Sequence, residues 1–271
     1  MTFPVVAERD EVELKAIAEN LPHALLIEAE EGLESEKAVE WLANYETSEM
    51  IYISPLDKKT TISVEQIRDL QREIRTQPSL RRVIIIDDAH NMTESAENAL
   101  LKSLEEPGQG NHFLLTAAER SQLLPTIVSR CQIISLHRTS PAQDSEILKK
   151  SVLTDSDKKQ LLFLAAGRPK LISELSRQPK LFAKYKQLAT DAKHILAGND
   201  DYKSLLTLNS YITDRQNALR LIDTLLYMIR FQIASRGADE QIMSLLERTE
   251  LAERSLKGNG NVRLALVRVL T

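Results

Sequence analysis

Hydrophobic residues in the first half of the chain form short, almost continuous runs that alternate with longer segments of helical periodicity. Continuous apolar runs are typical of strands buried on both faces of a parallel sheet. Their alternation with helices predicts an α/β domain whose sheet is covered on both sides. The expected strands are residues 23–28, 50–54, 82–87, 113–117 and 131–136, and the expected helices are residues 34–45, 63–75, 93–105 and a short one within 121–129.

The strand pattern stops after residue 136, and the rest of the chain is expected to be helical. Thr139, Ser140 and Pro141 are typical of a linker followed by a helix start. Three modules are predicted: an α/β domain over residues 1–138, a small helical domain over 139–179 and an all-helical domain over 180–271. Their expected helices include residues 144–152, 155–166, 169–178, 214–235, 239–256 and 261–270.

Net charge, cysteine content and the length of the apolar runs exclude several functional classes. The formal net charge of −4 over 271 residues means that any contact with nucleic acid needs a local basic patch. Cys131 is the only cysteine, which excludes an internal disulfide and a cysteine-rich zinc site. The first ten residues lack a signal-peptide pattern, and no apolar run is long enough to span a membrane, so a cytoplasmic protein without a membrane partner is expected.

The segment after the first expected strand, residues 27–37, stands where an α/β nucleotide-binding domain has its phosphate loop. Such a loop needs glycines, a Lys and a Ser or Thr, because backbone N–H groups, an ammonium and Mg²⁺ together hold the phosphates. Gly32 is the only glycine here, and Gly-Lys-Ser/Thr occurs nowhere in the chain. Several glutamates take their place, and carboxylates repel phosphate. The sequence predicts a degenerate loop; the alternative is an unusual loop in which Lys37 substitutes.

Asp87 and Asp88 follow the third expected strand directly. Two carboxylates at the carboxyl end of a buried strand are typical of a Mg²⁺ ligand and a water-polarising group in nucleotide hydrolysis. Without a phosphate loop, the pair is interpreted as a relic of such a site. The alternative is that the two residues only end the strand and start a turn.

Two motifs in the middle of the chain are the most specific: NALLKSLEEP at residues 98–107 and PTIVSRCQ at residues 125–132. Together they resemble the AAA+ clamp-loader family, and the resemblance is sharpest over residues 82–134. It implies an α/β P-loop NTPase-like (AAA+) parallel-sheet domain, followed by a helical lid and an all-α collar that holds subunits in a ring. With the degenerate loop around Gly32, it favours the non-hydrolysing, delta-prime type of subunit.

The resemblance also assigns roles. By position in the Ser-Arg-Cys motif, Arg130, with Ser129 beside it, is expected to act as an arginine finger in the ATP site of a neighbouring subunit; the alternative is that Arg130 pairs with a local acid. The chain would need no cofactor of its own, because ATP and Mg²⁺ would be bound by that neighbour. The implied partners are the ATPase (gamma/tau) and delta subunits of the bacterial DNA polymerase III clamp loader, and primer–template DNA inside this hetero-oligomer.

The chain departs from the catalytic members of the family in two further places. Ala117 and Ala118 are expected to fill the position of a polar nucleotide sensor, and the single cysteine excludes the zinc module that many bacterial relatives carry. Arg168 stands near the position of another nucleotide-sensing residue and is a candidate remnant of it. Two rival interpretations stay open: a divergent AAA+ ATPase that still hydrolyses ATP, and a stand-alone DNA-binding or adaptor protein with a relic fold.

Arg68, Arg72 and Arg75 recur at i, i+4 and i+7 in the expected helix 63–75 and form one basic stripe. Helices near this position line the DNA chamber in the family, so the stripe is a candidate phosphate contact. A solvated helix face, offset by Asp69 and Glu73, is the alternative.

Overall fold

The computed structural model describes residues 2–56, 60–149, 151–198, 201–258 and 260–270. The chain divides into two compact units. The first, here the sheet unit, comprises Met1–Ser151 and Gly167–Ser173, and the second, here the helical unit, comprises Val152–Ala166 and Glu174–Thr271. The predicted division into three modules stays a prediction, since the segment between residues 139 and 179 contributes to both units.

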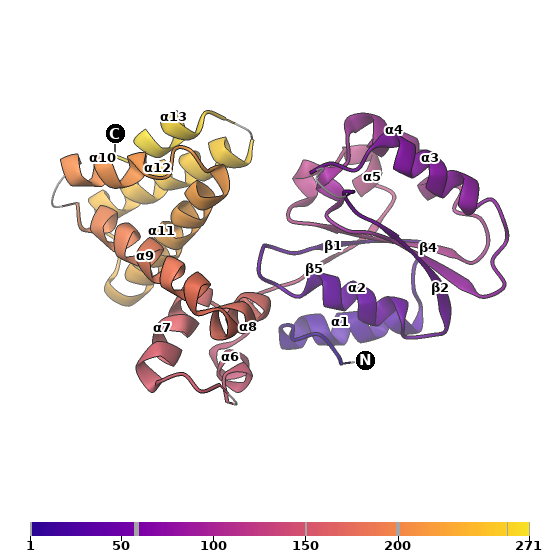
Figure 1. Ribbon diagram of the computed structural model, residues 1–271, viewed down its shortest axis with the longest axis horizontal. Helices are drawn as coiled ribbons and strands as arrows, with labels where there is room; N and C mark the ends of the chain where they lie inside the picture. The colour runs from indigo at the N-terminus through magenta and orange to yellow at the C-terminus, as the bar shows by residue number, and fades with distance from the viewer. Residues whose placement is uncertain (1, 57–59, 150, 199–200, 259, 271) are drawn as a thin grey trace. The chain divides into compact units, whose positions relative to one another are not determined.

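The sheet unit contains five strands that all pair in parallel, in the order β2-β3-β4-β1-β5 (Figure 1). All five predicted strands are confirmed. Because parallel strands point the same way, the segments that follow β1, β3 and β4 meet at one edge of the sheet, where ligands bind in such folds. The strands are β1 (Ala24–Glu28), β2 (Ser48–Ile53), β3 (Arg81–Ile86), β4 (Asn111–Ala117) and β5 (Gln132–Ser135).

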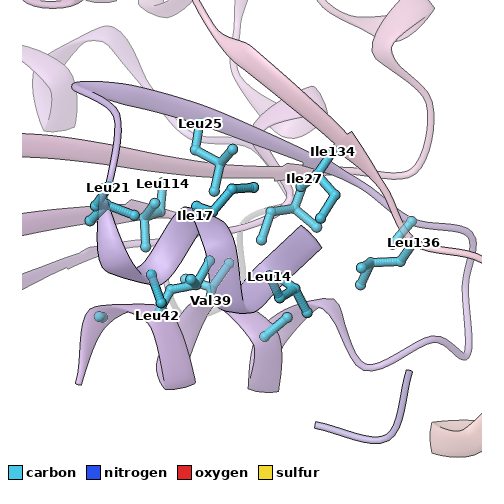
Figure 2. Close-up of a cluster of buried hydrophobic side chains, with 14 of the residues drawn as sticks. Leu14, Ile17, Leu21, Leu25, Ile27, Val39, Leu42, Leu114, Ile134 and Leu136 are labelled. Atoms are coloured by element: carbon cyan, nitrogen blue, oxygen red, sulfur yellow. The ribbon is translucent and has the colours of Figure 1, made fainter. Parts of the chain in front are cut away.

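Helices cover both faces of the sheet (Figure 1). On one face lie α1 (Glu8–Glu19) and α2 (Ser35–Ala43), and on the other α3 (Val64–Glu73), α4 (Glu94–Glu105) and α5 (Pro125–Val128). Figure 2 shows the first of the two cores, in which Leu14 and Ile17 of α1 and Leu42 of α2 pack against strand residues such as Ile27. The second core includes Phe113, which is completely buried.

The helix α1 was missed in the sequence, and several predicted helices have wrong bounds: the expected helix 261–270, for example, is α13, which runs Val262–Val267. The expected helix 63–75 ends at Glu73, so that Arg75 lies beyond the C-cap residue Ile74. The expected helix 144–152 is α6, which runs Pro141–Ile147 and therefore starts three residues earlier. The cause is local, because Ser140 caps the helix by accepting a hydrogen bond from the N–H of Gln143 and proline is favoured in a first turn.

The helical unit is built from α7 and from the helices that follow α8. Phe163 of α7 makes edge-to-face ring contacts with Tyr227 and Phe231 of α11, at centroid distances of 5.3 and 5.6 Å. Among the described residues, none of the helices combines the length and the apolar character that crossing a bilayer requires. The helices are α7 (Asp155–Ala165), α8 (Pro169–Arg177), α9 (Pro179–Ala197), α10 (Asp201–Asn209), α11 (Arg215–Arg236), α12 (Glu240–Lys257) and α13 (Val262–Val267).

Candidate functional site

The turn at Gly32 is packed against the start of α8. Gly32 has a φ of +96°, and its carbonyl accepts hydrogen bonds from the N–H groups of Lys170 (3.0 Å) and Leu171 (3.3 Å). A Cβ on Gly32 would lie 3.1 Å from the Cβ of Leu171 and 3.2 Å from that of Arg168. A phosphate loop directs N–H groups at its ligand. Here a loop carbonyl instead occupies the donors at a helix N-terminus.

The basic side chains around this loop form ion pairs with glutamates of the same chain. Arg138 pairs with Glu30 through two hydrogen bonds of 2.5 and 2.7 Å, and Lys170 pairs with Glu36 at 2.8 Å. Lys37, the candidate substitute for the missing phosphate-loop lysine, pairs with Glu34. The glutamates of the loop are therefore largely neutralised inside the protein. The ion pairs weaken the repulsion of phosphate expected from the sequence, and they also occupy the cations that could have held a phosphate.

The buried carboxylate of Glu34 connects the loop to the N-terminal segment and to α2. Its side chain is only 3% exposed, and besides Lys37 it accepts a hydrogen bond from the N–H of Val5 (2.8 Å). A buried carboxylate at this place, and cations already paired with glutamates, are unfavourable for a triphosphate. The residues present at this end of the strands do not fit a bound nucleotide.

Asp87 and Asp88 lie at the same edge and are joined by a residue that the sequence analysis missed. The hydroxyl of Thr116 donates to Oδ1 of Asp87 (2.7 Å) and accepts from the N–H of Asp88 (2.8 Å). Asp88 adopts a left-handed conformation, with a φ of 48°. Burial, followed by the charge of Asp87, raises the pKa of Asp88. The available signal was a polar residue within the apolar run of β4.

The arrangement gives Asp87 and Asp88 a structural part in the turn after β3. In the described part of the chain, His, Cys, Asp and Glu side chains form no group of three or more that could hold a metal ion. Ala117 is buried and Ala118 half-buried at the end of β4, and neither methyl group can donate a hydrogen bond to a phosphate. The assignment of the sensor position to these alanines stays a prediction.

Replacing Thr116 by Val is expected to lower the free energy of unfolding by about 1–3 kcal/mol, because the N–H of Asp88 loses its hydrogen bond to the buried Thr116 and Asp87 loses a donor. Urea titration followed by the fluorescence of Trp41, the only tryptophan, measures the effect within the sheet unit. The exposed Thr126, changed to Val, is the matched control and should shift stability by less than about 0.5 kcal/mol. Equal effects of the two substitutions would contradict the role given to Thr116.

Arg130 lies at the opposite end of the strands, beside their amino ends. It precedes β5, and β5 pairs in parallel with β1, so Arg130 stands near the amino ends of the strands while Gly32 follows the carboxyl end of β1. The length of β5 alone separates the two edges by roughly 10 Å. Arg130 therefore cannot serve the degenerate loop of its own chain.

The guanidinium of Arg130 is held at the surface by local contacts. It forms an ion pair with Glu105 at the end of α4, donates to the carbonyl of Thr126 (2.9 Å) and reaches the hydroxyl of Ser129 (3.4 Å). One third of the Arg130 side chain is exposed, as is half of the Glu105 side chain. The local pairing considered as an alternative is thus present, in a form that solvent reaches.

Cys131 follows Arg130 directly and packs with the core under α3, α4 and α5. It is half-buried, and burial raises the pKa of its thiol to about 11. The thiolate is therefore scarce at neutral pH, and the residue acts as a small hydrophobic side chain at the start of β5.

The basic stripe is exposed but less regular than the sequence predicts. Arg68 and Arg72 lie on α3, whereas Arg75 follows its end. Arg72 pairs with Asp69 at 2.7 Å, and both side chains are about 70% exposed. This pair agrees with the solvated face that was the alternative, and a contact with DNA stays a prediction.

The parallel strand order and the following helices are found in known proteins. A gamma subunit-related protein of DNA polymerase III from Thermotoga maritima has a similar fold, with a TM-score of 0.54, 20% sequence identity and 96% of both chains covered. The parallel five-stranded sheet covered by helices and the helical C-terminal region are the fold of the AAA+ class of α/β proteins.

Residues 6–140 match the family described as DNA polymerase III, delta subunit. The delta-prime subunit from Haemophilus influenzae is 38% identical over 125 residues, or 45% of this chain and 38% of that protein. The delta-prime subunit from Pseudomonas aeruginosa is 33% identical over 146 residues, or 52% and 44%. Over this region the chain belongs to the DNA polymerase III delta-prime family. The matches span about two fifths of the length of these relatives.

Proposed function

We propose that this chain is the delta-prime-like subunit of a clamp loader that neither binds nor hydrolyses ATP itself, and that it completes the ATP site of a neighbouring subunit. The observation that carries the proposal is the contrast between the two edges of the sheet. At the carboxyl edge, Gly32 is bonded to α8 and the surrounding cations hold glutamates. At the amino edge, Arg130 is kept at the surface.

Position supports a role of Arg130 in trans. Subunits that follow one another head to tail in a ring place one edge of each subunit against the other edge of the next. A guanidinium delivered in this way stabilises negative charge on a transferring phosphoryl group and accelerates hydrolysis by roughly 10³–10⁵-fold. This gain is about 4–7 kcal/mol of activation free energy. Releasing Arg130 from the exposed Glu105 costs about 1 kcal/mol or less.

The chain would sit with the gamma/tau ATPase and delta subunits in a cytoplasmic hetero-oligomer that loads the sliding clamp onto primer–template DNA. ATP and Mg²⁺ would belong to the neighbouring subunit. Arg68, Arg72 and Arg75 are the candidates for contacts with DNA phosphates, although Asp69 already holds Arg72.

Calorimetry and co-purification test the proposal together. The isolated chain should give no saturable heat with a non-hydrolysable ATP analogue and Mg²⁺ at millimolar concentrations, and it should co-purify with the gamma/tau and delta subunits from the same organism. Micromolar nucleotide binding would favour the divergent ATPase. Tight binding of primer–template DNA without any complex with those subunits would favour the stand-alone DNA-binding protein.

A further inference from the structure

The strand β2 is the outermost strand on one side of the sheet, that is, an edge strand. It pairs with β3 on its inner side. The N–H of Asp87 donates to the carbonyl of Ile53 across that inner side (3.0 Å). Backbone polar groups of successive strand residues point to alternate sides of a strand. The N–H and C=O groups of Tyr52 and Met50 therefore point outward, along the edge of the sheet.

The side chains of these two residues are exposed as well. Met50 is 51% and Tyr52 49% exposed. Their register with Val83 and Ile85 of β3 places them on the face of the sheet that α2 covers. Proteins protect edge strands with charged side chains, prolines or bulges. The sequence SEMIYI of β2 contains no lysine or proline, and its one charged residue, Glu49, pairs with Arg82 of β3. Methionine and tyrosine are instead enriched where proteins bind one another.

A row of polar side chains on α2 runs beside this edge. Glu36, Glu40 and Asn44 are spaced four residues apart and so share one side of the helix. The amide of Asn44 reaches the sulfur of Met50 (3.7 Å). Partial burial, with the negative charges of Asp87, Glu40 and Glu36, raises the pKa of Tyr52 to about 12. The contact between Asn44 and Met50 places this side of the helix beside β2.

We propose that β2 and the adjoining side of α2 bind an extended, basic segment of a partner protein. The segment would add to the sheet as a further strand through the outward N–H and C=O groups of Met50 and Tyr52. Alternate side chains of an added strand face α2, where lysines or arginines meet Glu40, since Glu36 already pairs with Lys170. Carboxylates beside this edge repel nucleic acid, so charge favours a basic peptide. This surface is separate from Arg130.

The test uses the full-length ¹⁵N-labelled chain and three synthetic ten-residue peptides: an alternating lysine–valine peptide, an alternating glutamate–valine peptide and a helix-forming lysine–alanine peptide. Only the lysine–valine peptide should shift the backbone amide signals around Met50 and Tyr52 in a saturable way. Met50→Pro removes an outward donor while the pairing with β3 stays intact, and Glu40→Lys reverses a charge. Each should weaken binding about tenfold or more.

Glu13→Lys, the same charge change at an exposed position of α1, is the matched control and should leave binding unchanged. If Met50→Pro does not fold, as judged by Trp41 fluorescence, Glu40→Lys decides alone. The proposal is overturned if the lysine–valine peptide causes no saturable shifts at β2, if the glutamate–valine or helical peptide binds as well, or if Glu13→Lys weakens binding as much as Glu40→Lys.

Discussion

Replacing Arg130 by Ala is expected to slow ATP hydrolysis in the adjoining subunit by about 10³–10⁵-fold while ATP still binds there. In the proposed role, the guanidinium would act on charge that develops during phosphoryl transfer, so its loss would raise the activation barrier more than it weakens ground-state binding. Arg130→Lys keeps the charge but loses the planar fork and should recover only a small part of the rate. Single-turnover ATP hydrolysis by the reconstituted loader after DNA is added, with ATP affinity measured in parallel, checks both variants at this one site.

The matched control for this experiment is Arg120→Ala. Arg120 is also an exposed arginine paired with a glutamate, Glu28, but it follows β4 and so lies at the carboxyl edge. Its replacement should leave turnover unchanged. Unchanged turnover in Arg130→Ala would remove the finger assignment, and an equal loss in Arg120→Ala would point to a general defect in assembly.

Replacing Gly167 by Ala is expected to destabilise the sheet unit by about 2–5 kcal/mol. Gly167 has a φ of +80°, which costs an alanine about 1–2 kcal/mol, and the new Cβ would lie 2.8 Å from the carbonyl oxygen of Thr139. That neighbour cannot move freely: the N–H of Thr139 donates to the carbonyl of Gly167 (2.9 Å), and its hydroxyl bonds to the buried Asp144. Overpacking adds about 1–3 kcal/mol.

Gly108→Ala separates the cost of the positive φ from the cost of the close contact with Thr139. Gly108 also has a positive φ, +71°, but an added Cβ would meet only the side-chain amide of Asn111, at 3.3 Å. It should cost about 1–2 kcal/mol, the conformational part alone. Urea titration followed by Trp41 fluorescence compares the two, since both glycines and Trp41 belong to the sheet unit. Equal losses would mean that the contact between Gly167 and Thr139 is not tight.

The strands were predictable because parallel strands that are covered on both faces have a nearly continuous apolar sequence, which few other elements share. The helix α1 was not, because its buried residues, Leu14 and Ile17, are mixed with charged residues and with the exposed Val12. Helical spacing likewise gave no sign that α3 stops before Arg75, since the polar pattern continues past the end of the helix.

The degenerate loop was predictable from the sequence because it depends on residues that the chain lacks. The absence of Gly-Lys-Ser/Thr predicts a degenerate loop, but what closes this loop comes from far along the chain. Glu30 pairs with a residue 108 positions away, and the carbonyl of Gly32 bonds to N–H groups of α8. Such contacts depend on the folded arrangement and not on local spacing. Thr116 was predictable in principle, as a hydroxyl within a buried strand.

The central claim is that Arg130 completes the ATP site of a neighbouring subunit. Its most direct test counts the ATP molecules that each assembled complex hydrolyses in the first turnover after DNA is added. The experiment compares complexes that contain either the unchanged chain or Arg130→Ala, under conditions where both bind the same amount of ATP. The account predicts a burst smaller by one ATP per complex with Arg130→Ala, because one neighbouring site loses its arginine. Bursts of equal size would contradict it.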